Sequence, residues 1–598
     1  MLHRLSRTAL LLAVALVVTS VPAIGQSDST HPISQQWLQT PAERTDYQQG
    51  GTLYESLMEF VYELESRSEL MNVVKLTETL MGRDVVLAVL SNPPIFKPED
   101  LAYSDKPMVL IVNNVHGGEV AGKDAAMEIL RDLVMGDLRS LLDEVVVLVV
   151  PTINPDGAEL RRRTNEEGFD MNRDYIKLES QEIQALVTKV LADWRPHIHV
   201  DTHHGGAAPY TLTFQTNMNP AGDAGIMQIG NEHILPQVRE ALRAENYDGF
   251  WYSGPGQVDG VAGWSPTSVE PRKQHVYSTL ANVIGFLYET PSGSHRVVDN
   301  GTRVEAIPDE DRYRHQVRGQ YIGQRELIRF AAENPADLAK VVSEARSDAI
   351  ERGNDDTDDD LIPIEYEQVA KFNDSFWRRV GGGRGRAEPG ETVEFELVEG
   401  PIFTKWEPTR TATRPWGYLL PPSLTKVVPL LLQHDITVKQ LAEPVELEVE
   451  VFYATEITHA QYFQAHYLKA VKGETRTETV SLPAGSFFIP SGQPMSNFIS
   501  YILEPETNDN LVTWGFLDNV LRVTPSQEEL DAQRAQLEER LASLSEAERN
   551  QFGARFERQL EQLEAGQQVP IFRLMKKTNL AGELVRLFNQ YEANRYLR

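Results

Sequence analysis

Short, uniformly apolar segments alternate with longer amphipathic segments between residues 108 and 288, and this alternation restricts the possible fold more than any other feature. Strands are predicted at 108–113, 145–150, 197–201 and 284–288, and helices at 120–134 and 180–194. Strands that are apolar on both faces are typical of a mostly parallel sheet with helices on both sides. We therefore expect an α/β fold, in which ligands bind beyond the carboxyl ends of the strands.

The α/β domain is predicted to extend over residues 45–345, and a linker region is predicted at 346–390. Two segments support this linker: an acidic one at 351–360 and a glycine-rich one at 381–390. Both compositions are typical of exposed loops and connections between domains.

Two further regions are predicted after the linker. Apolar and polar residues alternate at 445–453, as in a half-buried strand, so residues 391–524 are expected to form a separate β-rich accessory domain. Pro525 suits the first position of a helix, and residues 525–598 are predicted to be a helical C-terminal region.

The first 25 residues have the pattern of a signal peptide. Arg4 and Arg7 precede an apolar run at 8–18, and Ala23-Ile24-Gly25 resembles a cleavage site of small residues. The run is shorter than the roughly 18 apolar residues that span a bilayer as a helix. We expect an exported protein, periplasmic or extracellular, without a stable membrane anchor.

Composition argues against several classes of partner. The formal net charge is −30, and removal of Arg4 and Arg7 with the signal peptide would make it −32. Nucleic acids and anionic membranes bind basic surfaces, so neither is expected as a partner. The sequence has no cysteine, which excludes disulfide stabilisation and a lipid anchor on cysteine.

The predicted strand at 108–113 leads into a His-x-x-Glu motif formed by His116 and Glu119. The same loop is similar to a nucleotide-binding P-loop, because Gly122-Lys123 follows Gly117 at the required spacing. The P-loop interpretation fails at Asp124, because that position needs a hydroxyl group that binds Mg²⁺. Two metal ligands on one turn are the better interpretation.

A third ligand is expected at the end of the strand at 197–201, where His203 would lie close to the first two. A set of two histidines and one glutamate leaves the fourth tetrahedral position of a zinc ion free for water. The neighbouring His197, His199 and His204 are expected to have structural roles.

With these residues in place, the sequence resembles the zinc carboxypeptidase family (the M14 metallopeptidases) over roughly residues 45–330. The resemblance consists of five elements in the family's order: His116-Gly-Gly-Glu119, Asn154-Pro-Asp-Gly157, Asp170-Met-Asn172-Arg173, Asp201-Thr-His203 and Glu289 near the end of the last strand. It implies a zinc carboxypeptidase-like fold, a mostly parallel mixed sheet with helices on both faces. Residues 391–524 resemble the C-terminal extension of some large bacterial members.

The resemblance also implies roles for the residues around the metal. His116, Glu119 and His203 would bind one zinc ion per chain. Glu289 would be the general base that takes a proton from water and returns it to the leaving amine. Asp170 would accept a hydrogen bond from the second ring nitrogen of His116 and so fix its tautomer.

Other residues are expected, by the same resemblance, to bind the substrate. Asn172 and Arg173 would hold the free carboxylate of a peptide. Arg163 would polarise the scissile carbonyl group, although Arg161 and Arg162 are adjacent alternatives. Tyr277 would cap the substrate, with Tyr252 as a second candidate.

The resulting prediction is an exported zinc metallocarboxypeptidase that hydrolyses the C-terminal peptide bond of peptides. One alternative is an amidohydrolase of the same fold that acts on N-acyl amino acids or cell-wall peptides, because a carboxylate-binding site would serve those substrates too. An alternative of another class is a secreted binding protein without turnover. Only about twenty residues separate the predicted cleavage site from the α/β domain, so a folded inhibitory prodomain is not expected.

Overall fold

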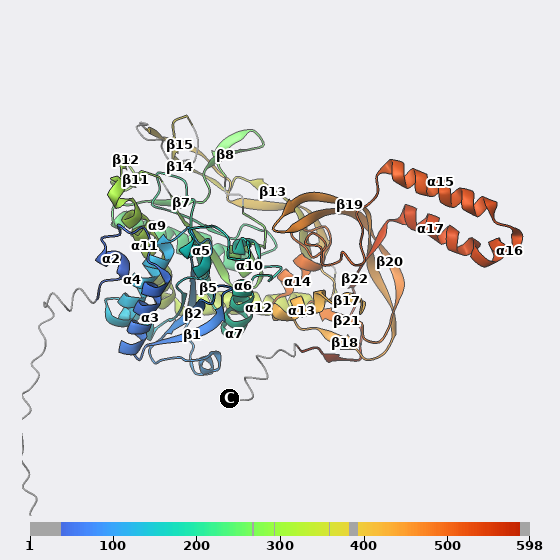
Figure 1. Ribbon diagram of the computed structural model, residues 1–598, viewed down its shortest axis with the longest axis horizontal. Coiled ribbons are helices and arrows are strands. Elements are labelled where there is room, and N and C mark those ends of the chain that lie inside the picture. Colours follow the sequence, from blue (N-terminus) through green and yellow to red (C-terminus); the bar gives the residue numbers. More distant parts are fainter. Residues whose placement is uncertain (1–37, 266–267, 292, 358, 382–392, 587–598) are drawn as a thin grey trace, which may run out of the picture.

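The computed structural model describes residues 38–586, except 266–267, 292, 358 and 382–392. The predicted signal peptide lies outside the described residues. Figure 1 shows an α/β part with a second, β-rich part beside it and a pair of helices that projects from the second part. No helix in the described part of the chain is long and apolar enough to cross a membrane.

An eight-stranded mixed sheet forms the centre of the α/β part, in the order β1-β2-β4-β3-β5-β10-β6-β7. The strands are β1 (Met71–Glu78), β2 (Asp84–Leu90), β3 (Met108–Asn113), β4 (Val146–Val150), β5 (Ile198–His204), β6 (Leu212–Thr216), β7 (Gly249–Trp251) and β10 (Ile284–Thr290). The four central strands β4, β3, β5 and β10 are mutually parallel. Strands β2 and β6 pair antiparallel with β4 and β10, and β1 pairs antiparallel with β2. The predicted mostly parallel mixed sheet is therefore confirmed.

Helices cover both faces of this sheet, as the uniformly apolar strands predict. One face packs against α3 (Tyr54–Arg67), α4 (Ala121–Met135), α9 (Leu235–Ala244) and α11 (Arg312–Glu333). The other face packs against α6 (Gln181–Leu186), α7 (Ala192–Trp194) and α10 (Gln274–Leu280). The four central strands β4, β3, β5 and β10 are almost entirely buried, because their apolar side chains enter these two cores from both faces.

The region predicted as a linker contains regular structure, so that interpretation is wrong for most of its described residues. Helix α12 (Pro335–Asn354) crosses the predicted boundary, and β13 (Leu361–Val369) and β14 (Phe372–Arg379) follow it. Strand β13 pairs with β16 (Lys405–Thr413), and β14 pairs with β15 (Phe395–Ile402). Many residues in β13 and β14 are exposed and charged, and such strands have the composition of loops.

The sheet that contains β14 and β15 also includes two strands of the α/β part. β8 (Pro255–Val258) and β9 (Val261–Trp264) extend it in the order β14-β15-β9-β8. Strand pairing between β9 and β15 therefore links the α/β part to the segment that follows it.

The second part is built on a seven-stranded sheet in the order β20-β19-β22-β17-β21-β18-β23. Its strands are β17 (Gly417–Leu420), β18 (Lys439–Leu441), β19 (Val445–Phe463), β20 (His466–Leu482), β21 (Phe487–Pro490), β22 (Gln567–Leu574) and β23 (Gly582–Leu584). The expected β-rich part and helical segment are both present. The helical prediction is nevertheless wrong for β22 and β23, because β22 lies inside the sheet between β19 and β17.

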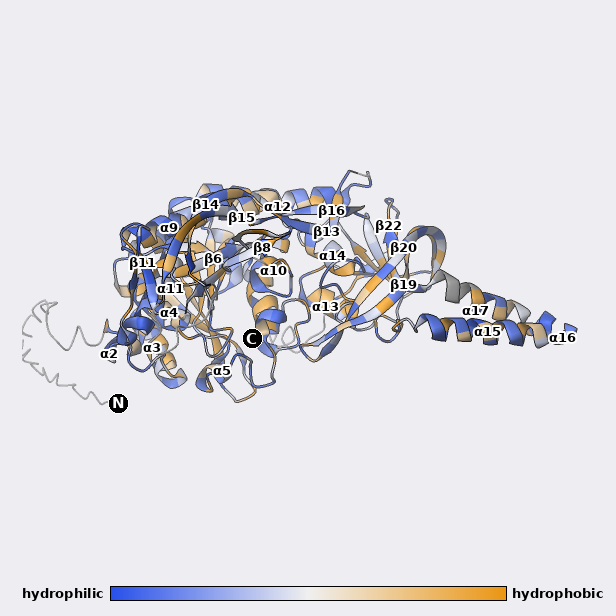
Figure 2. Cartoon of the chain, turned by 90° about the horizontal axis from the view of Figure 1, so that it is seen from above, coloured by the Kyte–Doolittle hydropathy of each residue, from blue (hydrophilic) through white to orange (hydrophobic). Residues whose placement is uncertain are grey.

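The helices between residues 525 and 565 form a hairpin that projects away from both sheets, as Figures 1 and 2 show. It consists of α15 (Gln527–Ser543), the short α16 (Glu546–Glu548) and α17 (Ala554–Ala565). Helix α15 has no buried residue, and Figure 2 shows that it is largely hydrophilic.

One buried cluster joins the α/β part to the β-rich part. It includes Ile183 and Tyr277 on the first side, and Phe498 and Trp514 on the second. The helices α13 (Val427–Gln433) and α14 (Ser496–Leu503) contribute most of their apolar residues to it. The β-rich part is therefore packed on the α/β part through a continuous core and is not separate from it.

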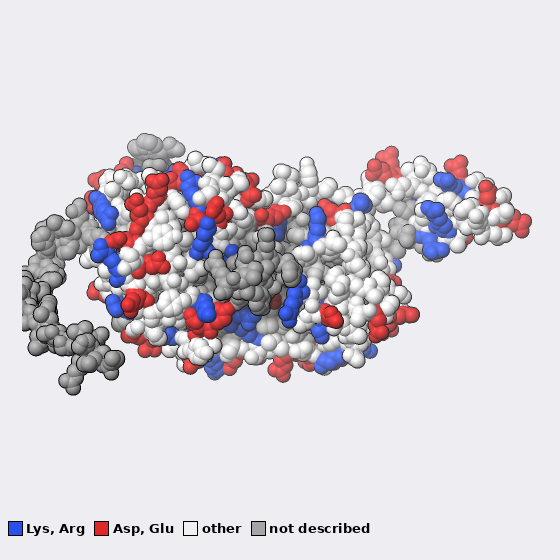
Figure 3. Space-filling view, turned by 60° about the horizontal axis from the view of Figure 1, so that its bottom comes forward, with Lys and Arg blue, Asp and Glu red and all other residues white. Residues whose placement is uncertain are grey.

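The surface is mixed in charge despite the large negative total. On the face shown in Figure 3, acidic and basic side chains are interspersed over both parts and over the helical hairpin. This face therefore offers no extended basic area.

Candidate active site

The candidate active site lies at the carboxyl ends of β3, β5 and β10. Strand β5 is parallel to both neighbours, so the three ends lie side by side at one edge of the sheet. His203 of β5 is directly opposite Glu289 of β10. The loop after β3 brings His116 and Glu119 to the same edge, where ligands are bound in sheets of this type.

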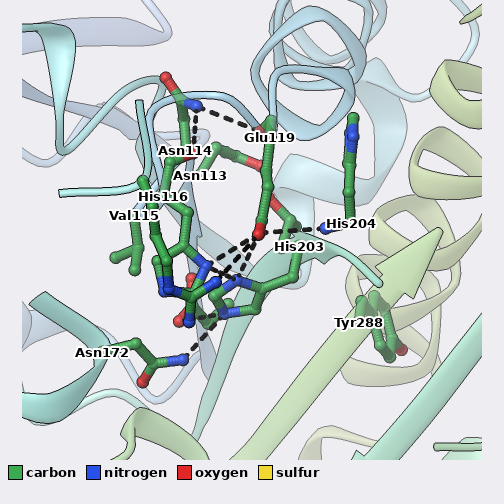
Figure 4. A network of polar contacts seen from close by, with 12 residues as sticks. Asn113, Asn114, Val115, His116, Glu119, Asn172, His203, His204 and Tyr288 are labelled. Carbon is green, nitrogen blue, oxygen red and sulfur yellow. Dashed lines mark hydrogen bonds and ion pairs between the residues drawn. The ribbon is translucent and has the colours of Figure 1, made fainter. Parts of the chain in front are cut away.

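The loop that carries His116 and Glu119 is held in shape by Asn114. The backbone of Asn114 is left-handed, with φ 63°, and its Nδ2 donates to the carbonyl oxygens of His116, Gly117 and Glu119 at 2.9, 3.1 and 3.1 Å (Figure 4). A side-chain carbon at Gly117 would lie 2.0 Å from the carbonyl carbon of Gly157. Glycine is therefore required where this loop meets the turn of the Asn-Pro-Asp-Gly motif.

Three buried or partly buried side chains converge on one point. The Nδ1 atoms of His116 and His203 are 3.0 Å apart, and Glu119 Oε2 lies 3.0 Å from the first and 2.9 Å from the second (Figure 4). Two ring nitrogens and a carboxylate oxygen that face one another at these distances form a group that could hold a metal ion. The set fits zinc, which binds two histidines and one glutamate and keeps a fourth position open.

Acidic side chains contact the far ring nitrogens of both histidines. His116 Nε2 donates to Asp170 Oδ1 at 3.0 Å, and His203 Nε2 donates to Asp201 Oδ2 at 2.8 Å. These contacts leave each Nδ1 free to face the centre of the group. They also raise the basicity of the rings, as carboxylates behind metal-binding histidines do.

The charges of the group are strongly coupled. Burial opposes ionisation of Glu119, but the neighbouring His116 and His203 hold its pKa well below its ordinary value. Burial likewise opposes ionisation of Asp170, but the hydrogen bond and charge of His116, with Arg173 and Arg163, lower its pKa. Both carboxylates are therefore anionic around neutral pH, as metal binding requires.

Glu289 is a buried carboxylate with an unused oxygen. It is 7% exposed, and among the described residues its Oε2 has no hydrogen-bond partner. A side-chain carbon at Gly205 would lie 2.8 Å from this oxygen, so glycine keeps the space before it open. Burial, with the charge of Glu119, raises the pKa of Glu289 to about 7, although His203, His116 and Arg163 oppose the change.

Only one of the three adjacent arginines reaches the metal-binding group. Arg163 Nε donates to Asp170 Oδ2 at 2.8 Å, and its Nη1 lies 3.4 Å from Glu119 Oε1. Arg161 bonds to the carbonyl oxygen of Gly50, and Arg162 pairs with Glu166. The geometry therefore favours Arg163, and not Arg161 or Arg162, as the arginine that acts at this site.

Asn172 and Arg173 lie beside the group on a short turn that Asp170 caps. Asn172 Nδ2 is 3.0 Å from His203 Nε2, and its Oδ1 accepts from the backbone N–H of Gln274 at 2.9 Å. Arg173 is partly buried and donates to the carbonyl oxygen of Asn172 at 2.7 Å. Within the described part of the chain Arg173 forms no ion pair, so its guanidinium group has capacity for an anionic ligand.

The sequence of this region decides the family. Residues 57–204 match the family model of the zinc carboxypeptidases, peptidase family M14. Residues 57–204 therefore belong to a zinc carboxypeptidase domain. The chain is accordingly a hydrolase of the metallocarboxypeptidase type, with zinc as its metal, and the M14 resemblance is confirmed.

The chain is similar to carboxypeptidases from several organisms, over different shares of its length. Carboxypeptidase 2 of Trichophyton tonsurans is 23% identical over 526 residues, which cover 84% of this chain and 91% of that protein. Carboxypeptidase E of Caenorhabditis elegans is 28% identical over 199 residues, or 30% of this chain and 39% of that protein. A solved metallo-carboxypeptidase from Pseudomonas aeruginosa is 17% identical, with a TM-score of 0.37, and the match covers 48% of this chain and 70% of that one.

The relatives that match over most of the chain are fungal. The likeness of the C-terminal extension to large bacterial members is therefore not borne out.

Tyr277 is not at the active site, in contrast to the prediction that it caps the substrate. Its side chain is 2% exposed, and its hydroxyl group lies 2.9 Å from Nδ1 of His434 in the β-rich part. The first residue of α10, Gln274, contacts Asn172, whereas Tyr277 faces the shared core beside Phe498. The helix thus brings its N-terminus, and not Tyr277, to the site.

Sequence reasoning assigned no role to three residues that shape the site. Asp201 and Asn114 have local signals, because Asp201 lies two residues before His203 on the same face of β5 and Asn114 directly follows β3. Gln464 of the β-rich part has no such signal. Its Oε1 accepts from the backbone N–H of Asp170 at 2.9 Å across 294 residues of sequence.

Proposed function

We propose that this enzyme removes the C-terminal residue of peptides, with one zinc ion bound by His116, Glu119 and His203. The observation that carries the proposal is Arg173, a partly buried cation without an ion pair beside this group. A free carboxylate at the end of a peptide is a ligand for which a guanidinium group offers two parallel hydrogen bonds.

The proposed chemistry is hydrolysis of the peptide bond next to the bound carboxylate. When bound to such a set, zinc is a Lewis acid that lowers the pKa of a coordinated water to about 7. Glu289 takes a proton from the attacking water and delivers it to the nitrogen of the leaving amine as the carbon–nitrogen bond breaks. Its unpartnered Oε2 and its pKa of about 7 suit both transfers.

Two further side chains are proposed to act on the substrate. The Arg163 side chain is 48% exposed next to Glu119, so it can polarise the scissile carbonyl group and stabilise the negative charge that develops on its oxygen. Asn172 is proposed to support the bound carboxylate together with Arg173 through its amide N–H groups, because its Oδ1 already accepts from the backbone N–H of Gln274.

Metal content and a matched substrate panel test this proposal. The purified protein would be analysed for zinc and then incubated with one peptide in three forms: free C-terminus, C-terminal amide, and the last residue alone as an N-acyl amino acid. Mass spectrometry would identify the product. We expect about one zinc per chain and release of one residue from the free peptide. Rapid hydrolysis of the N-acyl amino acid alone would favour the amidohydrolase alternative, and no turnover with zinc bound would favour a binding protein.

Export is also part of the proposal, because residues 1–25 have the pattern of a signal peptide. N-terminal sequencing of the protein recovered from outside the cytoplasm should begin at Gln26. Recovery of the chain only in the cytoplasm, with Met1 intact, would contradict export.

A further inference from the structure

A long β-hairpin of the β-rich part extends to the active site. Strands β19 and β20 pair along their whole length, from Val445 opposite Leu482 to Phe463 opposite His466. Strand β22 pairs with β19 only between Glu450 and Ala454, so the outer part of the hairpin is a two-stranded ribbon. A two-stranded ribbon is stable only when it packs on other structure.

The tip of this hairpin is a tight turn in an unfavourable backbone conformation. Its two central residues are Gln464 and Ala465, with φ of 50° and 61°. A two-residue hairpin turn with positive φ at both positions normally contains asparagine or glycine. Neither residue is of that type. Unfavourable backbone conformations are concentrated at functional sites, which directs attention to the side chain of Gln464.

The side chain of Gln464 contacts the residue that organises the active site. Its Oε1 accepts from the backbone N–H of Asp170 at 2.9 Å. The carboxylate of Asp170 holds His116 through Oδ1 and Arg163 through Oδ2. Asp170 also caps the turn that carries Arg173. The hairpin tip thus fixes the backbone from which the carboxylate-binding arginine projects.

Two other contacts hold the tip against the zinc carboxypeptidase domain. His466 Nε2 lies 2.8 Å from Glu179 Oε1. The ring of Phe463 lies under the guanidinium group of Arg272, 5.1 Å from its central carbon. The contact of Gln464 with Asp170 is therefore one of three that place the tip.

We propose that Gln464 is a positioning residue, which holds the turn from Asp170 to Arg173 where Arg173 meets the terminal carboxylate of the substrate. The proposal rests on the proposed carboxypeptidase function. It makes the β-rich part a determinant of specificity for substrates with a free C-terminal carboxylate, because its hairpin supports the residue that recognises that group.

The test is Gln464→Asn, which withdraws the acceptor by one methylene group but favours the left-handed turn. Asparagine adopts positive φ more readily than glutamine, so the hairpin should still form. The matched control is Ala465→Asn, which makes the same substitution at the exposed neighbouring position and leaves Gln464 in place.

Binding would be measured by calorimetry in a Glu289→Gln background, which prevents turnover, with one peptide in its free and its C-terminally amidated form. We expect Gln464→Asn to weaken binding of the free peptide about three- to tenfold, the range for loss of one hydrogen bond, and to leave the amidated peptide unchanged. In the active enzyme, KM should rise and kcat should change little. Ala465→Asn should behave as the parent does.

A double-mutant cycle separates positioning from a general structural effect. If Gln464 acts through Arg173, its substitution should have almost no further effect on binding in an Arg173→Ala background. Equal weakening of both peptides, unchanged binding of the free peptide, or a full effect without Arg173 would each overturn the proposal. Failure of the proposed function itself would be visible in the parent, which would then bind both peptides equally.

Discussion

Replacement of Arg173 by alanine removes the cation that the proposed exopeptidase activity requires. Arg173 is partly buried, its side chain donates only to the carbonyl oxygen of Asn172 in the part of the chain that the structure describes, and it forms no ion pair there. Its loss should therefore leave the surrounding structure, and the bound zinc, unchanged. The substitution should therefore weaken only the interaction with the terminal carboxylate of the substrate.

The size of the effect follows from the environment of Arg173. Loss of one partner of a hydrogen-bonded, desolvated charge pair costs roughly 2–5 kcal/mol. Arg173 retains some contact with solvent, so the lower end applies, and about 2 kcal/mol corresponds to an about 30-fold decrease in kcat/KM. Arg173→Lys keeps the charge but loses the planar fork, so its kcat/KM should lie between those of the parent and the alanine variant.

The assay compares kcat/KM for one peptide with a free and with an amidated C-terminus. The parent should strongly prefer the free peptide, and Arg173→Ala should lose most of that preference while its rate on the amide changes little. Zinc content should be equal in all three proteins. A parent that cleaves both peptides equally, or a variant that loses the same factor on both, would refute the role of Arg173 in carboxylate recognition.

Four other substitutions test the remaining parts of the site and one buried acid. Glu289→Gln should keep zinc and peptide binding but lose most turnover, because an amide cannot transfer the proton; near-normal kcat would rule out Glu289 as the general base. His203→Ala should lose zinc in metal analysis, whereas His204→Ala, whose ring accepts from the backbone N–H of Ala121, should keep it; the reverse result would show that the ligands are misassigned. Glu128 is buried, and burial with the charge of Glu43 raises its pKa from 4.5 to about 7. The folded state therefore binds more protons than the unfolded state between these values, and this contribution to stability is complete below pH 4.5 and lost as pH rises through 7. Glu128→Gln should reduce the fall in unfolding free energy between pH 5 and pH 8 by about 2 kcal/mol in denaturant titrations, and an unchanged fall would contradict the assignment.

The central sheet could be predicted because its strands are apolar on both faces. The segment predicted at 108–113 coincides with β3, and that at 180–194 covers α6 and α7. A continuous apolar run indicates a strand that is buried on both faces, whichever strands it pairs with. The order of the strands, and the antiparallel edges, depend on contacts between distant segments and could not be derived in this way.

The zinc-binding group could be assembled from the sequence because metal binding demands particular side chains at particular places. His116 and Glu119 are three residues apart after one strand, and His203 ends another. The parallel sheet then brings these ends together. Tyr277 was placed wrongly because a tyrosine at that spacing carries no information about which face of α10 is buried.

The C-terminal half was less accessible to prediction, for a physical reason. The strands at 361–379 are partly exposed and charged, so their stability comes from pairing with distant segments. Strand β22 follows a polar helix, and nothing local indicates that it enters a sheet between two strands, β19 and β17, that lie more than one hundred residues away. Gln464 likewise has no chemical signature, because its function depends on one contact with Asp170.

The position of β22 also has a consequence for how the chain reaches its native state. β17 and β19 are both made long before β22, and each must present an unpaired edge until residues 567–574 arrive between them. Arg573 then joins Glu504 at 3.0 Å in a buried ion pair that only the last part of the chain can complete. The hairpin that is proposed to support Arg173 extends from this same sheet. We therefore expect a nascent or truncated chain to have an open, aggregation-prone edge and no selective peptidase activity, so that assembly of the sheet and acquisition of specificity occur in one late step.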